Sequence, residues 1–258
     1  MRRILITTGG KEIGWSRHNE EGIIRDYDKE VDRLFESAQK FGLECIRYDD
    51  KYIYSRPYYP EHKNVMDKVS FGFTYKAIEM YETLKRVDYD DVVLLTDSNH
   101  VVQSDPSIFY DIATKEGAFI YNHLWVSYPN RMYTRRDTFV NMDCDEERYW
   151  NAEQMQINLM AFKKTDINLD FTREWFECCL DYKIMFGENK YPNFPDYRVH
   201  RHDQSIFSIL REKYHFPYLH RGAKAMWAEN TIKEMKTIGI PGAIGNIHRR
   251  EADMEESV

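Results

Sequence analysis

Hydrophobic and polar residues follow one another along the first part of the chain in a pattern that predicts a strand, a helix and a second strand. Residues 3–8 are a short run rich in β-branched side chains, and the two glycines after it are typical of a buried strand that ends in a loop. Residues 28–41 carry apolar side chains at the i, i+3, i+4, i+7 spacing of an amphipathic helix, and residues 43–48 again suit a strand. This order favours a parallel sheet with a crossover helix.

The rest of the chain continues the alternation of helices and strands. Further helices are expected at residues 76–86, 107–114, 171–182 and 203–213, and further strands at residues 91–96, 117–121 and 156–162. We expect loops at residues 52–63 and 188–199, an irregular charged region at residues 130–150, and a frayed acidic tail from about residue 250. No linker divides the sequence. We therefore predict one α/β domain over residues 1–258, with a central, mostly parallel sheet flanked by helices.

The composition is that of a globular protein. Hydrophobic residues make up 42% and charged residues 31% of the chain, which argues against a disordered or fibrous protein. The longest apolar runs, such as residues 92–95, fall far short of the roughly 20 residues that a membrane helix needs. The apolar start of the sequence is too short for a signal peptide, and the four cysteines lack CxxC spacing, as expected of reduced thiols. We predict a cytoplasmic protein without a transmembrane segment.

Charge and aromatic content narrow the classes of ligand. A net charge of −7 argues against general nucleic-acid binding, which normally leaves a basic footprint. Aromatic residues reach 15%, and the 19 tyrosines have a flat apolar face and a hydroxyl that suit stacking on a sugar or a base. Tyrosines that simply fill a half-exposed surface would give the same composition, so both interpretations stay open.

A glycine-containing segment after the first strand is one candidate ligand site. Residues 7–14 read TTGGKEIG, and glycines at this position let a nucleotide approach the backbone. The spacing matches neither the dinucleotide fingerprint GxGxxG nor the P-loop. A loop that contacts a ligand and a plain turn are equally compatible with it.

A second candidate follows the most strongly predicted strand. Residues 91–96 deliver Asp97 to the carboxyl edge of the sheet, where open α/β sheets bind ligands. If the chain stays extended, Asp97 and Asn99 point to the same side and offer two oxygen ligands to a divalent cation that neutralises a diphosphate. An Asx-turn, in which Asp97 caps nearby backbone N–H groups, fits the same spacing.

Two histidine-containing segments complete the candidates. Residues 200–205 (HRHDQS) open the helix 203–213, where the helix dipole favours anions, although an isolated Asp at a helix start is usually an N-cap. His248 lies near the end of the sequence beside two arginines that could meet a phosphate, and His220 is an alternative for the same role. A single His in such a place is more often a surface residue than a ligand.

Five segments in this order resemble one family of enzymes. They are residues 71–76 (FGFTYK), 90–97 (DDVVLLTD), 156–165 (QINLMAFKKT), 171–175 (FTREW) and 200–210 (HRHDQSIFSIL). Together they are similar to the small sugar-nucleotide glycosyltransferases of surface and capsular polysaccharide synthesis, some of which occur in bacteria and large DNA viruses. The resemblance implies a GT-A-like, Rossmann-type fold, and HRHDQS is its most specific segment.

The resemblance also implies roles for individual residues. The residues implied to contact the nucleotide-sugar donor are Thr7, Thr8, Gly9, Lys76, Asp97, Ser98, Asn99 and His202. The family's acidic motif binds Mn²⁺ or Mg²⁺, and here it reads Asp97-Ser98-Asn99 without a second carboxylate. Related enzymes often complete the metal site with a histidine near the C-terminus, so the resemblance implies His248 as the third ligand beside Asp97 and Asn99. Asp203 and Gln204 are implied to be catalytic and to face the sugar and the acceptor.

We therefore predict a glycosyltransferase that moves a hexosyl or pentosyl group from a nucleotide-diphosphate sugar, most simply a UDP-sugar, to a glycan acceptor. It would act in the cytoplasm, that of the host if the protein is viral. In an inverting reaction Asp203 would take the proton of the acceptor, and in a retaining reaction Gln204 or a carboxylate would face the anomeric carbon. The sequence is compatible with both.

Two alternatives belong to other functional classes. A non-catalytic module that binds a nucleotide or a carbohydrate is supported by the incomplete acidic motif. An NAD-dependent oxidoreductase fits less well, because the dinucleotide fingerprint is missing. The prediction of a transferase requires that the carboxyl edge of the strand 91–96 and the start of the helix 203–213 form opposite walls of one cleft.

Overall fold

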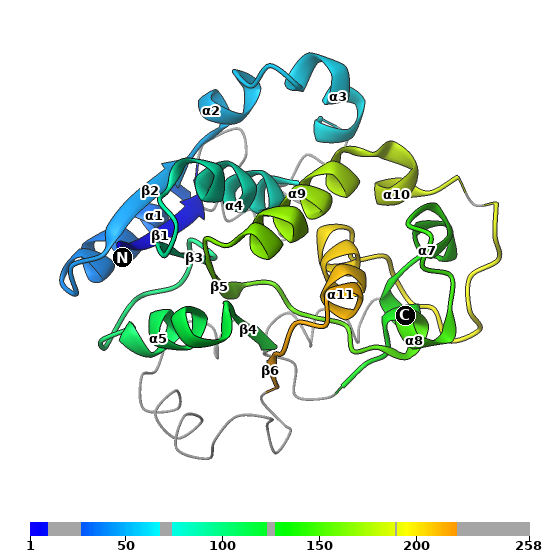
Figure 1. The fold of residues 1–258 in the computed structure, drawn as a ribbon. Coiled ribbons are helices and arrows are strands. Elements are labelled where there is room, and N and C mark those ends of the chain that lie inside the picture. The colour runs from blue at the N-terminus through cyan, green and yellow to red at the C-terminus, as the bar shows by residue number, and fades with distance from the viewer. Residues whose placement is uncertain (10–26, 68–73, 123–126, 189, 221–258) are drawn as a thin grey trace, which may run out of the picture.

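A mixed sheet lies at the centre of the structure, a computed structural model that describes residues 1–9, 27–67, 74–122, 127–188 and 190–220 (Figure 1). Its strands are β1 (Arg3–Thr8), β2 (Glu44–Tyr48), β3 (Val92–Thr96), β4 (Ala118–Asn122), β5 (Leu159–Lys163) and β6 (Leu219–His220). They lie in the order β2-β1-β3-β5-β4-β6; β5 is antiparallel to β3 and β4, and the other pairs are parallel. The prediction of an α/β fold with a mostly parallel sheet is confirmed.

Helices fill most of the connections between the strands. They are α1 (Tyr27–Gln39), α2 (Asp50–Tyr54), α3 (Tyr59–Met66), α4 (Tyr75–Arg86), α5 (Ser107–Glu116), α6 (Asn130–Tyr133), α7 (Arg136–Asn141), α8 (Glu147–Asn151), α9 (Asp166–Leu180), α10 (Tyr182–Phe186) and α11 (Asp203–Lys213). The predicted helices coincide with α1, α4, α5, α9 and α11. The helix α9 begins earlier than predicted, because the hydroxyl of Thr165 caps it by accepting a hydrogen bond from the N–H of Asn168.

Two regions predicted as irregular contain short helices, so these predictions are wrong. Residues 52–63 overlap α2 and α3, and residues 130–150 include α6, α7 and most of α8. The Asp49 carboxylate caps α2 by accepting a hydrogen bond from the Tyr52 N–H at 2.7 Å, and Pro60 lies in the first turn of α3, where no helical hydrogen bond is lost. Helices of only four to eight residues complete too few turns to show a helical period in the sequence.

Helices cover both faces of the sheet. In β1, Ile4 and Ile6 point toward the layer of α4, α9 and α11, whereas Leu5 points toward the layer of α1 and α5. In Figure 1, α4 and α9 run side by side over one face. The buried Phe171 ring of α9 stacks 5.5 Å from the Phe162 ring of β5, and the buried Trp175 ring packs 5.0 Å from the Phe207 ring of α11. Since every residue of β3 is buried, the end of this strand is held firmly at the middle of the sheet.

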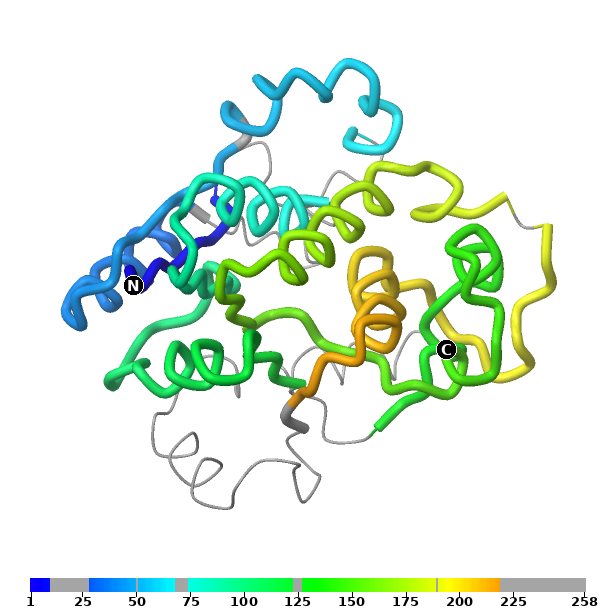
Figure 2. Tube along the Cα trace, in the orientation of Figure 1, coloured from blue at the N-terminus to red at the C-terminus, as the bar shows by residue number. Residues whose placement is uncertain are grey.

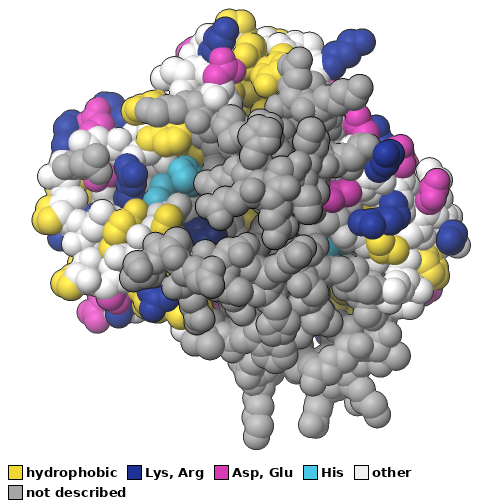
Figure 3. Space-filling view, turned by 180° about the vertical axis from the view of Figure 1, so that it is seen from behind, with side chains coloured by type: hydrophobic (Ala, Val, Ile, Leu, Met, Phe, Trp, Pro, Cys, Tyr) yellow, Lys and Arg dark blue, Asp and Glu magenta, His cyan; other side chains and the backbone are white. Residues whose placement is uncertain are grey.

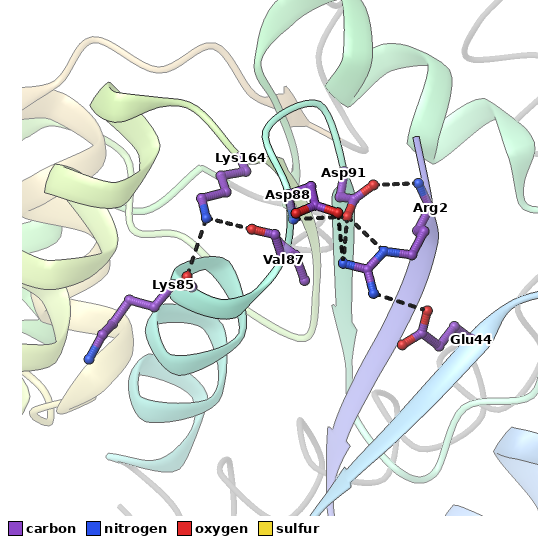
Figure 4. A network of polar contacts seen from close by, with 7 residues as sticks. All are labelled: Arg2, Glu44, Lys85, Val87, Asp88, Asp91 and Lys164. Carbon is purple, nitrogen blue, oxygen red and sulfur yellow. Dashed lines mark hydrogen bonds and ion pairs between the residues drawn. The ribbon is translucent and has the colours of Figure 1, made fainter.

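A polar network holds the amino ends of the central strands (Figure 4). The backbone N–H of Arg2 donates to the Asp91 carboxylate at 2.5 Å, and its guanidinium donates to the same carboxylate at 2.8 Å. Asp91 is 3% exposed. Burial alone would raise its pKa, but the N–H groups of Arg2 and Asp88 and the guanidinium outweigh burial, so the pKa of Asp91 is lowered. This network lies at the edge of the sheet opposite to Asp97 and fixes β1 against β3.

The helices α6, α7 and α8 and the segment 190–202 lie together on the side of the molecule away from α1 and β2 (Figure 2). Backbone hydrogen bonds join this segment to α6, from the Arg198 N–H to the Met132 carbonyl at 2.8 Å and from the Arg201 N–H to the Tyr133 carbonyl at 3.0 Å. As predicted, residues 190–199 contain no helix or strand. The segment leads directly into α11.

The predictions of reduced cysteines and of no transmembrane segment can be compared with the described residues. Cys45, Cys144, Cys178 and Cys179 are free thiols, as their spacing predicts. Burial raises the pKa of Cys178 to about 12, so this thiol stays protonated at neutral pH. No helix in the described ranges combines the length and the apolar character that crossing a membrane requires.

Candidate functional site

Three of the predicted site residues meet at the carboxyl edge of the sheet. Lys76 lies in the first turn of α4, Asp97 directly follows β3, and Asp203 is the first residue of α11. The ammonium Nζ of Lys76 is 2.7 Å from the Asp97 carboxylate oxygen Oδ1. The positive charge of Lys76 lowers the pKa of Asp203, and the negative charge of Asp97 raises it. The charge of Asp203 in turn raises the pKa of Lys76. The end of β3 and the start of α11 are therefore within electrostatic reach of one lysine.

Neighbouring strands orient this lysine. Lys76 Nζ donates a second hydrogen bond to the Ile157 carbonyl at 3.1 Å, just before β5, and the Asp97 N–H donates to the Asn158 carbonyl at 3.2 Å. Because β5 runs antiparallel to β3, its start lies beside the end of β3 and supplies both carbonyls. The side chains of Lys76 and Asp97 keep 23% and 31% of their surface exposed, so neither side chain is fully buried.

The chain turns after Asp97 instead of staying extended. The His100 N–H donates to the Asp97 carbonyl at 3.1 Å, which closes a β-turn over residues 97–100. The expectation that Asp97 and Asn99 share one side required an extended chain, so that argument does not hold. The hydroxyl of Ser98 points toward α1, where it donates to the Glu30 carboxylate at 3.2 Å.

Asp203 is a buried carboxyl group at the start of a helix. It is 3% exposed, its oxygen Oδ1 accepts a hydrogen bond from the Gln204 N–H at 2.9 Å, and its carbonyl accepts one from the Trp175 indole at 3.2 Å. Burial raises the pKa of Asp203 to about 7, although the nearby Lys76 acts in the opposite direction. A carboxyl group with this pKa can take or release a proton at neutral pH.

Asp203 itself is not the N-cap of α11; that position belongs to His202, whose φ of 51° lies in the left-handed region. A non-glycine residue in this region is strained and is held by its surroundings. The His202 ring packs 5.7 Å from the Phe186 ring and 4.9 Å from the His200 ring. Burial and then the charges of Arg135 and Arg201 lower the pKa of His202 to about 4, so the ring is neutral at neutral pH.

Sequence reasoning missed Glu79, which belongs to the same group. Glu79 lies one turn after Lys76 on α4, is 1% exposed, and accepts a hydrogen bond from the Thr8 hydroxyl. Burial raises its pKa to about 8, so it is mostly protonated at neutral pH. The spacing of three residues from Lys76 was a signal, because residues at i and i+3 share a helix face.

Of the predicted residues at the end of β1, Thr7 and Gly9 make hydrogen bonds to neighbouring strands, and Thr8 contacts the candidate site. The Thr7 hydroxyl donates to the Thr96 carbonyl at 2.7 Å between β1 and β3, and the Gly9 N–H donates to the Tyr48 carbonyl at 2.9 Å. The Thr8 hydroxyl instead donates a hydrogen bond to the Glu79 carboxyl group, which lies one helical turn from Lys76. The rest of the segment 7–14, from Gly10 onward, lies outside the described residues.

The described residues near Asp97 do not complete a metal site. In the part of the chain that the structure describes, no three or more His, Cys, Asp and Glu side chains are grouped to hold a metal ion. The Asp97 carboxylate is paired with Lys76. Asn99 contributes an amide oxygen that is buried and makes no hydrogen bond to a described residue, and His248 lies outside the described ranges. The assignment of Mn²⁺ or Mg²⁺ to Asp97, Asn99 and His248 stays a prediction.

Comparison with known proteins gives similarities of structure only. The sequence matches no protein-family model and no curated protein. The structure is similar to that of mouse xyloside xylosyltransferase 1, with 10% identity, 84% of each chain covered and a TM-score of 0.46. It is also similar to a glycosyltransferase involved in the glycosylation of the major capsid of PBCV-1, with 10% identity, 84% of this chain and 81% of that chain covered, and a TM-score of 0.40.

A further similar structure has a different activity in its name. It is 4-diphosphocytidyl-2C-methyl-D-erythritol synthase from Anaerococcus prevotii, with 11% identity, 91% of this chain and 96% of that chain covered, and a TM-score of 0.40. At these identities and scores the likeness concerns the α/β architecture, and it assigns no activity to this chain.

Proposed function

We propose that this protein is a glycosyltransferase that moves a sugar from a nucleotide-diphosphate sugar, most simply a UDP-sugar, to a glycan acceptor. The observation that carries the proposal is the meeting of Lys76, Asp97 and Asp203 at the carboxyl edge of the sheet. Open α/β sheets bind ligands at this edge. The residues gathered there also belong to the segments that resemble the glycosyltransferase family.

Asp203 is the proposed general base. The acceptor hydroxyl oxygen forms a bond to the anomeric carbon, the bond from that carbon to the diphosphate oxygen breaks, and the Asp203 carboxylate takes the hydroxyl proton. With a pKa of about 7, a substantial fraction of Asp203 is ionised at neutral pH. This assignment corresponds to inversion at the anomeric carbon.

Lys76 is the proposed partner of the departing diphosphate. Negative charge grows on the diphosphate in the transition state, and a fixed ammonium stabilises such charge. An ammonium has three N–H donors, and the contacts with Asp97 and Ile157 use two of them. The third donor is available to a phosphate oxygen. If Mn²⁺ or Mg²⁺ binds at Asp97, it would supply further positive charge for the same group.

The test is release of nucleoside diphosphate by the purified full chain, measured with each common nucleotide sugar with and without Mn²⁺. Asp203→Asn is expected to lower turnover by roughly 10²- to 10⁴-fold, because general-base catalysis contributes about that much. Asp170→Asn, an exposed carboxylate on α9, is the matched control and is expected to keep full turnover. The proposal is overturned if the protein neither binds nor turns over any of the donors. Unchanged turnover in Asp203→Asn would remove Asp203 from the mechanism.

A non-catalytic module that binds a nucleotide or a carbohydrate is the second candidate, favoured by the incomplete acidic motif. The two functions differ in turnover. Metal-dependent turnover that disappears in Asp97→Ala supports the enzyme. Saturable binding of a nucleotide sugar with no turnover in any condition supports the module.

A further inference from the structure

Arginine side chains gather beside the start of α11. Arg198 and Arg201 lie in the segment that backbone hydrogen bonds hold against α6, and Arg135 lies between α6 and α7. Figure 3 shows Lys and Arg side chains on the flank of the rear face where these elements lie, with a histidine among them.

Two of the arginines lie on tyrosine rings. The Arg201 guanidinium lies 5.5 Å from the centre of the Tyr133 ring, and the Arg198 guanidinium lies 5.7 Å from the centre of the Tyr128 ring. Arg198 Nη1 is also 3.5 Å from the Tyr133 hydroxyl. The two rings contact each other edge to face at 5.5 Å. We call these four residues the arginine platform; its tyrosines fix the guanidinium groups by cation–π contact.

The arginines differ in their partners. Arg131 pairs with Asp196 at 2.9 Å, and Arg136 pairs with Asp145 at 3.2 Å. By contrast, neither Arg198 nor Arg135 has an ion pair with a carboxylate in the described parts of the chain, and the Arg135 guanidinium donates to the Phe186 carbonyl. Arg198 is exposed, so its guanidinium is accessible to a dissolved anion.

The platform is joined rigidly to the proposed catalytic residue. The Ser205 hydroxyl donates to the Tyr133 carbonyl at 2.6 Å, and the Arg201 N–H donates to the Ser205 oxygen at 3.1 Å. These bonds connect α6, the segment 190–202 and the first turn of α11. The charges of Arg135 and Arg201 both lower the pKa of His202, the residue directly before Asp203. The platform is therefore joined to the first turn of α11, the turn that carries Asp203.

We propose that the arginine platform, with Arg135, binds an oxyanion carried by the acceptor glycan, a carboxylate or a phosphate, and so directs an acceptor hydroxyl toward Asp203. Guanidinium groups match the two oxygens of a carboxylate or phosphate, and an aromatic face such as that of Tyr128 can stack on a sugar ring. This inference rests on the proposed function, because it identifies the platform as the acceptor side of the same site.

The test compares acceptor mimics that differ only in charge. Binding to the full chain is measured by calorimetry, without donor, for three disaccharides that end in glucuronic acid, glucose 6-phosphate or unmodified glucose. We expect at least one charged mimic to bind roughly 10- to 100-fold more tightly than the neutral one, the gain typical of charge-assisted hydrogen bonds to arginine. Preference for the carboxylate identifies an acidic sugar, preference for the phosphate a phosphorylated acceptor, and equal gains a general oxyanion site.

Substitutions test which arginines cause the tighter binding of the charged mimics. Arg198→Gln is expected to remove most of it, and Arg198→Lys, which keeps the charge without the planar fork, to restore part of it. Arg135→Gln should weaken the preference further, and Arg173→Gln, an exposed arginine on α9, is the control that should change nothing. Equal affinity for all three mimics, or an unchanged preference in the double variant of Arg135 and Arg198, would overturn the inference.

Failure of the inference and failure of the proposed function give different results. Donor turnover with no preference for charged acceptors keeps the glycosyltransferase and removes the anion site. A charge preference that depends on Arg198, together with no turnover of any donor, keeps the anion site and removes the glycosyltransferase.

Discussion

Replacing Glu79 by Gln is expected to stabilise the protein relative to wild type, increasingly so as the pH rises from 5 to 8. Glu79 is 1% exposed, and burial raises the pKa of its carboxyl group to about 8, against the smaller opposing effects of Thr8 and Lys76. The same group in the unfolded chain titrates near pH 4.3, a general value for Glu. Gln keeps the oxygen that accepts the Thr8 hydrogen bond but does not titrate.

The magnitude follows from the linkage between proton binding and folding. Because the pKa is higher in the folded state, the contribution of Glu79 to stability is fully present below about pH 4.3 and is lost as the pH rises toward about 8. Each pH unit in this window lowers the free energy of unfolding by about 1.4 kcal/mol, so wild type should lose about 2 to 3 kcal/mol relative to Glu79→Gln between pH 5 and pH 7.

The assay is urea unfolding of both proteins at pH 5, 6, 7 and 8, followed by the fluorescence of tryptophan, since Trp175 is fully buried. The difference between the two free energies is the relevant quantity, because other titrating groups cancel in it. Glu177→Gln, on the exposed side of α9, is the control and should run parallel to wild type. If Glu79→Gln also runs parallel to wild type within about 0.5 kcal/mol, the inferred desolvation of Glu79 is wrong.

Three further predictions concern activity and stability. The rate of sugar transfer should rise with pH through a midpoint of about 7, because only the ionised form of Asp203 can take a proton; a pH profile of kcat/KM measures this, and a flat profile from pH 6 to 8 would contradict it. Arg2→Gln should lower the free energy of unfolding in urea, because the buried carboxylate of Asp91 loses its charged partner; an unchanged urea midpoint would contradict this. Phe171→Ala should cost about 3 to 5 kcal/mol in the same assay, since the fully buried ring packs 5.3 Å from that of Phe207; a cost under 1 kcal/mol would show that the core is not packed as described.

The candidate site could be predicted in part. Asp97 and Asp203 were identifiable because each stands at the end of a strongly patterned element, β3 or α11, and such ends carry the side chains of α/β sites. Lys76 entered through the family resemblance, and its ammonium lies 2.7 Å from the Asp97 carboxylate. Glu79 was missed because its spacing from Lys76 shows only that the two side chains share a helix face, and the sequence does not show that this face becomes buried beside β1.

The arginine platform was outside the reach of sequence reasoning for a related reason. Tyr133 and Arg201 are far apart in the chain, and the region around Tyr133 shows no regular pattern. Only the backbone hydrogen bonds between α6 and the segment before α11 bring them together. Local periodicity describes which face of an element is buried, and it contains no information about which other element supplies the contact.

By itself the sequence determined the class of fold, the long helices and the central strands, because the burial of one face leaves a period of two or 3.6 residues along the chain. Only the tertiary structure decided that β5 enters antiparallel between β3 and β4, and that one lysine pairs with Asp97 and lowers the pKa of Asp203 by its charge. Pairing across the sheet and the loss of water around a buried charge depend on groups distant in sequence. Their consequences, the pKa values of Asp203 and Glu79, therefore arise only when the chain is folded.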